Sequence, residues 1–287
     1  MDPSHIIFAL LGWLENNLDQ PLIMDRIASK SGYSKWHLQR MFSRITGTTL
    51  GSYTRARRLS RAAVALCVTD LPIIDIAIRY HFDSRQSFTR AFKKQFGQTP
   101  AFYRDTTEWP SFGICPPIRP GAATIPPLTY VTLQDVQLYG VTSSYTGSLG
   151  RDSTFFRADL HTDFWFHYLE QARILPSVLF GLNHVLPNKS PEMGQEVIFR
   201  YTTALQPKYA PIGQPVILAG GEYALFTYNG DTGGLQNFIL MLYDTYLPKL
   251  KLTRRQGPDI ECFYPQGKEE IATLHQSNCQ YLIPVYR

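Results

Sequence analysis

The segment SGYSKWHLQRMF, residues 31–42, carries side chains whose chemistry suits contact with the edges of DNA bases. An indole, an amide and a guanidinium lie close together there, at Trp36, Gln39 and Arg40. Arginine can bind guanine through two hydrogen bonds, glutamine can bind adenine in the same way, and an aromatic ring can contact a thymine methyl group. A helix core alone does not require this set, so the segment predicts a DNA-recognition helix.

Two short helical patterns meet at Gly32 and would position these side chains. The first pattern contains Ile27 and Ala28, and the second has Leu38 and Phe42 on its apolar side. Two short helices joined by a tight turn that contains glycine are typical of a helix-turn-helix. The serine at position 34 is placed to cap the second helix, because its side chain can accept a hydrogen bond from an amide of the first turn.

The same pattern recurs about fifty residues later. The stretch IASKSGYSKWHLQRMFSRITGTT, from Ile27, aligns with IAIRYHFDSRQSFTRAFKKQFGQT, from Ile76. The offset is 49 residues through the first helix and 50 residues from the second, so one extra residue falls in the turn. Arg40 then matches Arg90, and Gly47 matches Gly97. The repeat predicts a second helix-turn-helix unit.

Apolar periodicity predicts a helix over residues 3–18 and a longer helix over residues 50–68 that joins the two units. A helix of about 19 residues at 1.5 Å per residue spans roughly 28 Å. Two recognition helices in successive major grooves of one duplex lie about 34 Å apart. One chain can therefore supply both readers and bind an asymmetric site as a monomer.

Charge and cysteine usage restrict the class of protein. The 287 residues carry a net charge of +5, but residues 1–107 hold 15 Lys and Arg against 8 Asp and Glu, and residues 108–287 hold 13 against 15. A basic first part indicates a polyanion partner or a solvated basic face. The four cysteines form no CxxC or Cys/His cluster, so we expect neither a metal site nor a disulfide framework, and a reducing, cytoplasmic location. No apolar run is long enough for a membrane helix.

Prolines and glycines interrupt the pattern over residues 108–121, which predicts a connecting segment of limited flexibility. The remainder predicts an α+β domain with two rounds of strands and a helix. In the first round we expect strands over 130–133 and 138–145, a helix over 155–172, and strands over 178–182 and 197–204. In the second we expect strands over 216–218 and 223–228, a helix over 236–246, and strands over 260–264 and 281–285.

The segments GYSKWHLQRMF, RARRLS and FTRAFKKQF, with LTRR and GGEY further on, resemble the AraC/XylS family of transcription activators, in its branch of stress regulators. Residues 122–287 resemble the GyrI-like effector-binding domain. The resemblance implies a multidomain protein. An all-α DNA-binding domain (1–107) with two helix-turn-helix units on a long helix is followed by a linker (108–121). An α+β domain with a duplicated antiparallel sheet (122–287) completes the chain.

Roles for residues of the first domain follow from this resemblance. The base-reading positions are Trp36, Gln39 and Arg40 in the first unit and Gln86, Ser87 and Arg90 in the second. The expected phosphate contacts, which set register and salt dependence but not sequence, are Ser84, Arg85, Lys93 and Lys94. The chain departs from the family pattern at Arg85, where Gln is usual, and at Ser87, where Thr is usual.

Two groups in the first domain have alternative roles. Trp36 is either exposed for base contact or part of the core. The arginines of the long helix form either a basic patch for DNA or, as we favour, ion pairs with Asp75 and other carboxylates that fix the two halves; they are Arg55, Arg57, Arg58 and Arg61.

For the second domain the resemblance implies a cleft with a buried glutamate at its floor, a position that Glu261 in DIECFY occupies. The candidate wall residues are Trp165, Tyr168, Tyr201, Tyr223 and Tyr228, which could equally be ordinary sheet core. A carboxylate among aromatic rings favours a cationic ligand. Gln280 stands where an acidic residue is expected, which leaves room for neutral or anionic amphiphiles. The expected effectors are therefore lipophilic cations, bile acids or fatty acids.

These observations predict a transcription activator of stress and multidrug-resistance promoters, with double-stranded DNA and RNA polymerase as partners, and with no cofactor, membrane or enzymatic role. Two alternatives for the second domain are hydrolysis of a small molecule through Glu261 and a docking or sequestration platform. Alkyl transfer would need an activated cysteine, and Cys67 and Cys115 have no histidine beside them in the sequence.

Overall fold

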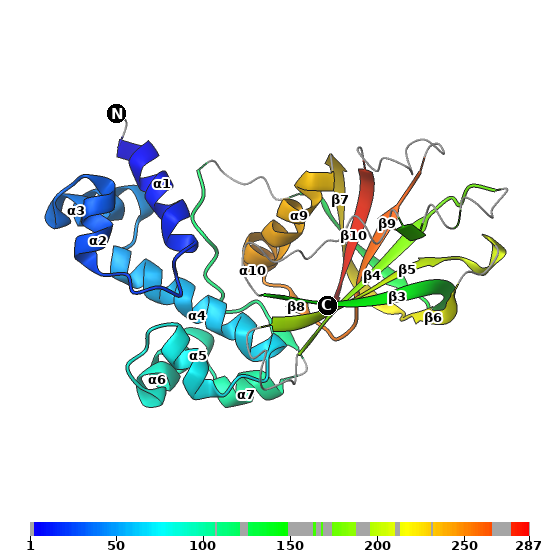
Figure 1. Ribbon diagram of the computed structural model, residues 1–287, viewed down its shortest axis with the longest axis horizontal. Helices are drawn as coiled ribbons and strands as arrows, with labels where there is room; N and C mark the ends of the chain where they lie inside the picture. Colours follow the sequence, from blue (N-terminus) through cyan, green and yellow to red (C-terminus); the bar gives the residue numbers. More distant parts are fainter. Residues whose placement is uncertain are drawn as a thin grey trace. The chain divides into compact units, whose positions relative to one another are not determined.

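The computed structural model describes residues 3–106, 108–120, 126–148, 163, 164, 168, 174–187, 196–209, 213–230, 232–265 and 277–286 (Figure 1). The chain divides into two compact units. The first comprises Met1–Thr106, Ser111–Thr124 and Asp244–Lys251, and the second comprises Thr107–Pro110, Ile125–Tyr243 and Leu252–Arg287. None of the helices in these described ranges has the length and hydropathy needed to span a bilayer.

The first unit is helical. Its helices are α1 (Pro3–Glu15), α2 (Met24–Ser31), α3 (Lys35–Thr46), α4 (Leu50–Val68), α5 (Ile73–Arg79), α6 (Arg85–Phe96), α7 (Pro100–Asp105) and α10 (Leu247–Leu250). Helix α1 ends three residues before the expected position, because the Asn17 side chain donates a 2.8 Å hydrogen bond to the Trp13 carbonyl and closes the last turn. Helix α4 begins after Thr49, whose hydroxyl accepts from the Ser52 amide.

Two apolar cores flank α4. The first joins α1, α2 and α3 to the beginning of α4 through Ile7, Leu10, Leu11, Leu14, Ile27, Leu38, Phe42, Leu50 and Tyr53. The second joins the end of α4 to α5, α6 and α7 through Leu59, Leu66, Ile76, Phe88, Phe92, Phe96 and Tyr103. Because α4 contributes to both cores, its rigidity transmits the orientation of one helix-turn-helix to the other.

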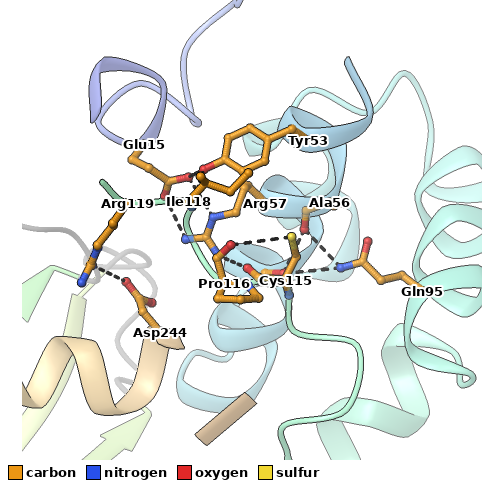
Figure 2. A network of polar contacts seen from close by, with 11 residues as sticks. Glu15, Tyr53, Ala56, Arg57, Gln95, Cys115, Pro116, Ile118, Arg119 and Asp244 are labelled. Atoms are coloured by element: carbon orange, nitrogen blue, oxygen red, sulfur yellow. Dashed lines mark hydrogen bonds and ion pairs between the residues drawn. The ribbon is translucent and has the colours of Figure 1, made fainter. Parts of the chain in front are cut away.

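A buried ion pair lies at the middle of α4 (Figure 2). The guanidinium of Arg57 donates two 2.8 Å hydrogen bonds to the two carboxylate oxygens of Glu15, and the Tyr53 hydroxyl donates a third bond of 2.7 Å. Glu15 and Arg57 are 6% and 1% exposed. Burial alone would raise the pKa of Glu15, but Arg57 and Tyr53 hold it below its ordinary value of 4.5. A buried charge is tolerated here because it is paired and fully hydrogen-bonded.

The other arginines of α4 behave differently from the expectation. Arg58 donates to the carbonyls of Leu18 and Gln20, at 2.8 and 2.7 Å, and so holds the loop after α1. Arg55 is exposed, and so is Asp75, for which the described residues provide no ion pair. The arginines Arg57 and Arg58 of the long helix therefore hold α1 and the loop after it, through Glu15 and backbone carbonyls, and neither binds Asp75.

The second unit is built on an antiparallel sheet with the strand order β1-β8-β10-β9-β4-β5-β3-β6; β7 pairs with β10, and β2 pairs with β7. The strands are β1 (Trp109–Pro110), β2 (Leu128–Leu133), β3 (Val136–Ser148), β4 (Leu179–Pro187), β5 (Glu196–Leu205), β6 (Gln214–Leu218), β7 (Gly221–Gly230), β8 (Thr253–Arg254), β9 (Asp259–Phe263) and β10 (Ser277–Tyr286). A 3₁₀ turn (Pro207–Tyr209), helix α9 (Thr232–Met241) and a π-helical turn (Leu242–Tyr246) complete the described elements.

The helix expected over residues 155–172 falls outside the described residues except at positions 163, 164 and 168, which are helical. Strand β3 is longer than expected at both ends, and α9 begins four residues before the expected helix. The central strand β9 is buried at all five positions, and two of them are the carboxylates Asp259 and Glu261. The sheet therefore encloses two acids at neighbouring positions of one face.

Replacing Glu15 with Gln should lower the free energy of unfolding of the helical unit by about 3 kcal/mol, because Arg57 then remains buried without its counter-charge. The measurement is denaturant unfolding of the full chain, followed by helical circular dichroism. Since the pKa of Glu15 is depressed in the folded state, the stabilisation is present above pH 4.5 and is lost as the pH falls below that value.

The matched control is Asp25→Asn, which removes the same charge from an exposed ion pair with Lys35. Its effect should stay below about 1 kcal/mol. Equal effects of the two substitutions would contradict the role assigned to the buried pair.

Candidate DNA interface and buried carboxylate site

Helix α3 presents the predicted base-reading residues to solvent. Its apolar side buries Leu38 and Phe42, while Gln39 and Arg40 are exposed and Trp36 is 67% exposed. The Arg40 guanidinium lies 5.3 Å from the centre of the Trp36 ring, within the range of a cation–π contact. The alternative in which Trp36 packs in the core is therefore wrong.

The ends of α3 are fixed by its sequence. The hydroxyl of Ser34 accepts a 3.3 Å hydrogen bond from the His37 amide, as the sequence predicted. The helix ends at Gly47, whose φ of 73° lies in the left-handed region that favours glycine. These two signals set the length of the reader at 12 residues.

Helix α6 has the same length and the same signals fifty positions later. Ser84 is its N-cap, and Gly97, with φ 75°, is its C-cap. The offset also pairs Trp36 with Gln86 and Gln39 with Thr89, a half-buried threonine that is absent from the predicted contact residues. The second reader therefore lacks an amide at that position.

The turns before the two readers differ by one residue, in agreement with the change of offset. The left-handed position is Gly32 in the first turn, with φ 72°, and His81 in the second, with φ 59°. The imidazole Nε2 of His81 lies 2.9 Å from the Asp19 carbonyl oxygen. This contact links the second turn to the loop after α1 and holds a conformation that is unusual for a residue with a side chain.

Two predicted contact residues of α6, Ser84 and Ser87, also cap the helix. The Ser84 hydroxyl accepts from the Ser87 amide at 3.1 Å, and the Ser87 hydroxyl accepts from the Ser84 amide at 3.2 Å and donates to the Ser84 carbonyl at 2.8 Å. This reciprocal capping box engages the Ser87 hydroxyl, while base reading by Ser87 stays a prediction. The equivalence of Ser84 with the cap Ser34 is the sequence signal for the Ser84 half of the box.

The remaining predicted residues of α6 are exposed. Gln86 and Arg90 lie on the side away from the buried phenylalanines, with Arg85, Lys93 and Lys94 around them. Within the described part of the chain, none of these cations forms an ion pair. The face of α6 is thus basic and available to an anionic partner.

In the second unit, the buried carboxylate of Glu261 accepts a hydrogen bond from the Tyr201 hydroxyl through Oε2. Glu261 is 0% exposed and Tyr201 is 1% exposed. Burial first, and the Glu261 charge second, raise the pKa of Tyr201 well above its ordinary value, so the tyrosine stays a proton donor.

The close approach of these two groups depends on Gly181, a residue that no sequence motif marks. Gly181 lies opposite Glu261 in the pairing of β4 with β9. A Cβ atom at this position would lie 1.9 Å from the Tyr201 hydroxyl oxygen and 2.8 Å from Oε2 of Glu261. Only glycine leaves room for the pair.

The neighbouring acid Asp259 is neutralised by a different set. Its Oδ1 lies 3.0 Å from Nη2 of Arg254, and its Oδ2 accepts from the hydroxyls of Tyr281, at 2.7 Å, and Tyr243. Burial alone would lower the pKa of Arg254, but Tyr243 and Asp259 raise it above its ordinary value. This compensated cluster is structural.

Strand register decides which of the candidate wall residues share a face with Glu261. Glu261 lies opposite Tyr281, and Tyr281 lies opposite Phe226, so alternate residues of β7 from Phe226, including Tyr228, point to the Glu261 side. Tyr228 contacts α9, with its ring 5.1 Å from that of Phe238.

Tyr223, a candidate wall residue, does not share a face with Glu261. It is three residues from Phe226 in β7, and this odd number places its side chain on the opposite face of the sheet. There it joins the core cluster that contains Leu225, and its hydroxyl donates to the Ala219 carbonyl at 2.6 Å. Tyr168 is buried and donates to the Ile174 carbonyl at 3.1 Å. Trp165 lies outside the described residues. The structure thus brings Tyr201 and Glu261 together, with Tyr228 on the same face.

Gly181→Ala should destabilise the full chain by about 2 kcal/mol, because the added methyl group overpacks the Tyr201–Glu261 pair. Tyr201→Phe alone should cost about 1 kcal/mol through the lost hydrogen bond. The double variant should be destabilised by at least about 0.5 kcal/mol less than the sum of the two single destabilisations. Thermal and denaturant unfolding measure the cycle, and strictly additive costs would show that Gly181 does not act through Tyr201.

Comparison with known proteins places the two units. A model described as a helix-turn-helix domain matches residues 27–106, and a model described as a GyrI-like small molecule binding domain matches residues 158–285. The Transcriptional regulator Rob of Salmonella typhimurium and the Right origin-binding protein of Escherichia coli K12 are each 51% identical to the chain over 292 residues, which cover all of both chains.

The Regulatory protein SoxS of Escherichia coli K12 is 51% identical over 104 residues, which are 36% of this chain and 97% of SoxS. The identity to SoxS is thus confined to about a third of the chain, whereas the identity to Rob extends through both units. The chain belongs to the Rob-like group of AraC-type DNA-binding transcriptional regulators that carry a GyrI-like small-molecule-binding domain.

Proposed function

We propose that the chain binds promoter DNA as a monomer, with α3 and α6 in successive major grooves of one duplex. The observation that carries the proposal is the equivalence of the two helices. Both are 12 residues long, both have a serine cap and a left-handed glycine end, and both expose an arginine at the same position, Arg40 and Arg90. Helix α4, at roughly 28 Å for 19 residues, provides a spacing close to one helical turn of DNA.

The two readers differ in what they offer to bases. Helix α3 exposes an indole, an amide and a guanidinium, at Trp36, Gln39 and Arg40. Helix α6 retains Gln86 and Arg90 for base edges and carries more cations, which suit phosphates. We therefore assign most of the sequence discrimination to α3 and a larger share of backbone binding to α6.

We also propose the division of labour along the chain. Residues 1–107 carry the two recognition helices, residues 108–121 lead from these helices to the rest of the chain, and residues 122–287 contain the sheet, which arose by duplication and senses an effector. As an activator the chain would bind RNA polymerase through its surface and act on stress and multidrug-resistance promoters in the cytoplasm. The similarity to Rob and SoxS supports this assignment.

Arg40→Ala should weaken binding to a preferred duplex by about 1–3 kcal/mol and relax base preference at one position, because a bidentate guanine contact is lost. Lys94→Ala is the matched comparison, since it removes a cation of the other reader. It should weaken binding to all sequences alike and lower the slope of log affinity against log salt by about 1.

Gel-shift titrations at several salt concentrations, on preferred and scrambled duplexes, separate the two effects. Base reading by Arg40 would be refuted if its replacement left the preference for the selected duplex unchanged.

For the second unit we propose an amphiphilic effector bound on the Glu261 face of the sheet. A buried carboxylate next to a tyrosine hydroxyl, with Tyr228 on the same side, favours a ligand with a cationic or hydrogen-bonding group and an apolar body. Lipophilic cations, bile acids and fatty acids are the classes to test.

We propose binding rather than catalysis for this unit. Burial raises the pKa of the Cys262 thiol to about 12 and that of Cys279 well above its ordinary value. Thiols with raised pKa values are poor nucleophiles at neutral pH. This chemistry does not favour covalent catalysis by either cysteine.

Glu261→Gln should weaken binding of tetraphenylphosphonium, a lipophilic cation, by at least about tenfold, or 1.4 kcal/mol, because the counter-charge is lost. Binding of cholate or laurate should be unchanged or stronger. Isothermal titration of the full chain gives both results, and Glu108→Gln, at an exposed carboxylate, is the control. If wild-type protein binds none of the three probes, a docking or sequestration role is favoured over sensing.

A further inference from the structure

The proline-rich stretch after α7 is expected to be a connecting segment, yet most of it packs on the helical unit. We define the strap as residues 111–119. Ile118 of the strap packs against the core of the first helix-turn-helix, and Ile114 packs against the core of the second. One short segment thus contacts both helix-turn-helix units.

The strap also forms hydrogen bonds along the middle of α4 (Figure 2). The Cys115 amide donates to the Ser60 hydroxyl at 2.9 Å, and the Cys115 carbonyl accepts from Nη1 of Arg57. The Ile118 amide donates to the Tyr53 hydroxyl at 3.3 Å. Arg57 and Tyr53 are the residues that hold Glu15, so the strap completes the buried network described above.

At its other end the strap is held by α6. The side-chain amide of Gln95 donates to the Gly113 carbonyl at 2.8 Å and to the Ala56 carbonyl of α4 at 3.1 Å. Gln95 therefore fastens α6, α4 and the strap together. The far end carries Arg119, whose Nη2 lies 3.8 Å from Oδ2 of Asp244.

The backbone of the strap is suited to a fixed path. Pro116 and Pro117 lack amide hydrogens and have restricted φ angles, so a segment containing them leaves fewer donors to satisfy and loses less entropy when it docks. Gly113 adopts a φ of +83° and has its neighbours so close that a Cβ would lie 2.6 Å from Cδ1 of Phe96 and 2.7 Å from the Gln95 carbonyl oxygen. The strap fits closely against α6 at this glycine.

We infer that the strap is a third component of the DNA-binding unit, which sets the separation and angle of the two recognition helices, and that Arg57 and Gln95 are its positioning residues. Neither side chain belongs to an exposed reader face: Arg57 is buried in α4, and Gln95 bonds α4 and the strap. A second link joins the halves through Arg58, His81 and the loop after α1. Loss of the strap should therefore loosen the spacing without separating the readers.

This inference rests on the proposal that both helices bind one duplex, and the test separates the two. The full chain first selects a duplex from a random library, and footprinting locates its two half-sites. Affinity is then measured by fluorescence anisotropy on duplexes with base pairs inserted or deleted between the half-sites, and on a duplex that retains only one half-site.

Two variants loosen the strap by different means. Gly113→Ala displaces it from α6, and Gln95→Leu removes the bonds that hold it while keeping the side-chain size and charge similar. Gly12→Ala, where a Cβ meets nothing within 4 Å, is the matched control. Circular dichroism verifies that each variant keeps its helical content.

We expect the affinity of wild type and Gly12→Ala to be highest at one spacing and to fall steeply on either side. Gly113→Ala and Gln95→Leu should bind the best spacing about tenfold more weakly, with a flatter profile, because two rigidly spaced sites bind with a higher effective concentration. Binding to the single half-site should not change.

The inference is overturned if both variants keep the wild-type spacing profile, or if they weaken binding to the single half-site by the same factor. If the wild type binds the duplex with one half-site as tightly as the duplex with two, the proposal that α3 and α6 bind one duplex fails as well.

Discussion

The buried ion pair between Glu15 and Arg57 is the constraint on which the helical unit depends. Its carboxylate and guanidinium are both nearly inaccessible to water, so they must bind each other. Neighbouring protein groups must supply most of their remaining hydrogen bonds. Glu15 ties α1 to α4, and Arg57 extends the network to the strap. Such a pair is geometrically demanding, and removal of either partner would leave the other charged group buried and unpaired.

The sheet of the second unit also buries two carboxylates, and each is held by different partners. Asp259 is neutralised by Arg254 and two tyrosine hydroxyls, which makes it part of the scaffold. Glu261, two residues further along the same strand, is held by Tyr201 in a space that Gly181 leaves open. Asp259 and Glu261 are two residues apart in one strand, so both side chains point to the same face of the sheet. Their environments nevertheless differ, because the neighbouring strands supply different partners to each.

Much of the helical unit could be predicted from sequence because its signals are local. Helix α3 is identified by the serine at its N-cap, the left-handed glycine at its C-cap and the spacing of its apolar residues. The same signals recur fifty residues later and identify α6. The offset also identifies Ser84 as the counterpart of the cap Ser34 and Thr89 as the counterpart of Gln39, but not the capping role of Ser87, whose counterpart is His37. The partners of Arg57 were not predictable, since Glu15 is 42 residues away in sequence and no local pattern marks the contact.

The buried carboxylate site was predictable only in part. Glu261 was identified by resemblance, but which tyrosines surround it depends on strand register, which a single sequence does not specify for strands far apart in the chain. For this reason the sequence does not show that Tyr223 lies on the face opposite to Glu261, and it does not single out Gly181, whose role is the absence of a side chain. The path of the strap escaped prediction because prolines indicate an irregular segment and not what it packs against.

Hydroxyl-radical footprinting of the full chain, on a duplex selected from a random library, shows whether one chain binds DNA through both α3 and α6. We expect two protected segments on one face of the DNA, about one helical turn apart. These segments should differ in sequence and be occupied by one chain per duplex. A single protected segment, or a palindromic pair occupied by two chains, would contradict this expectation.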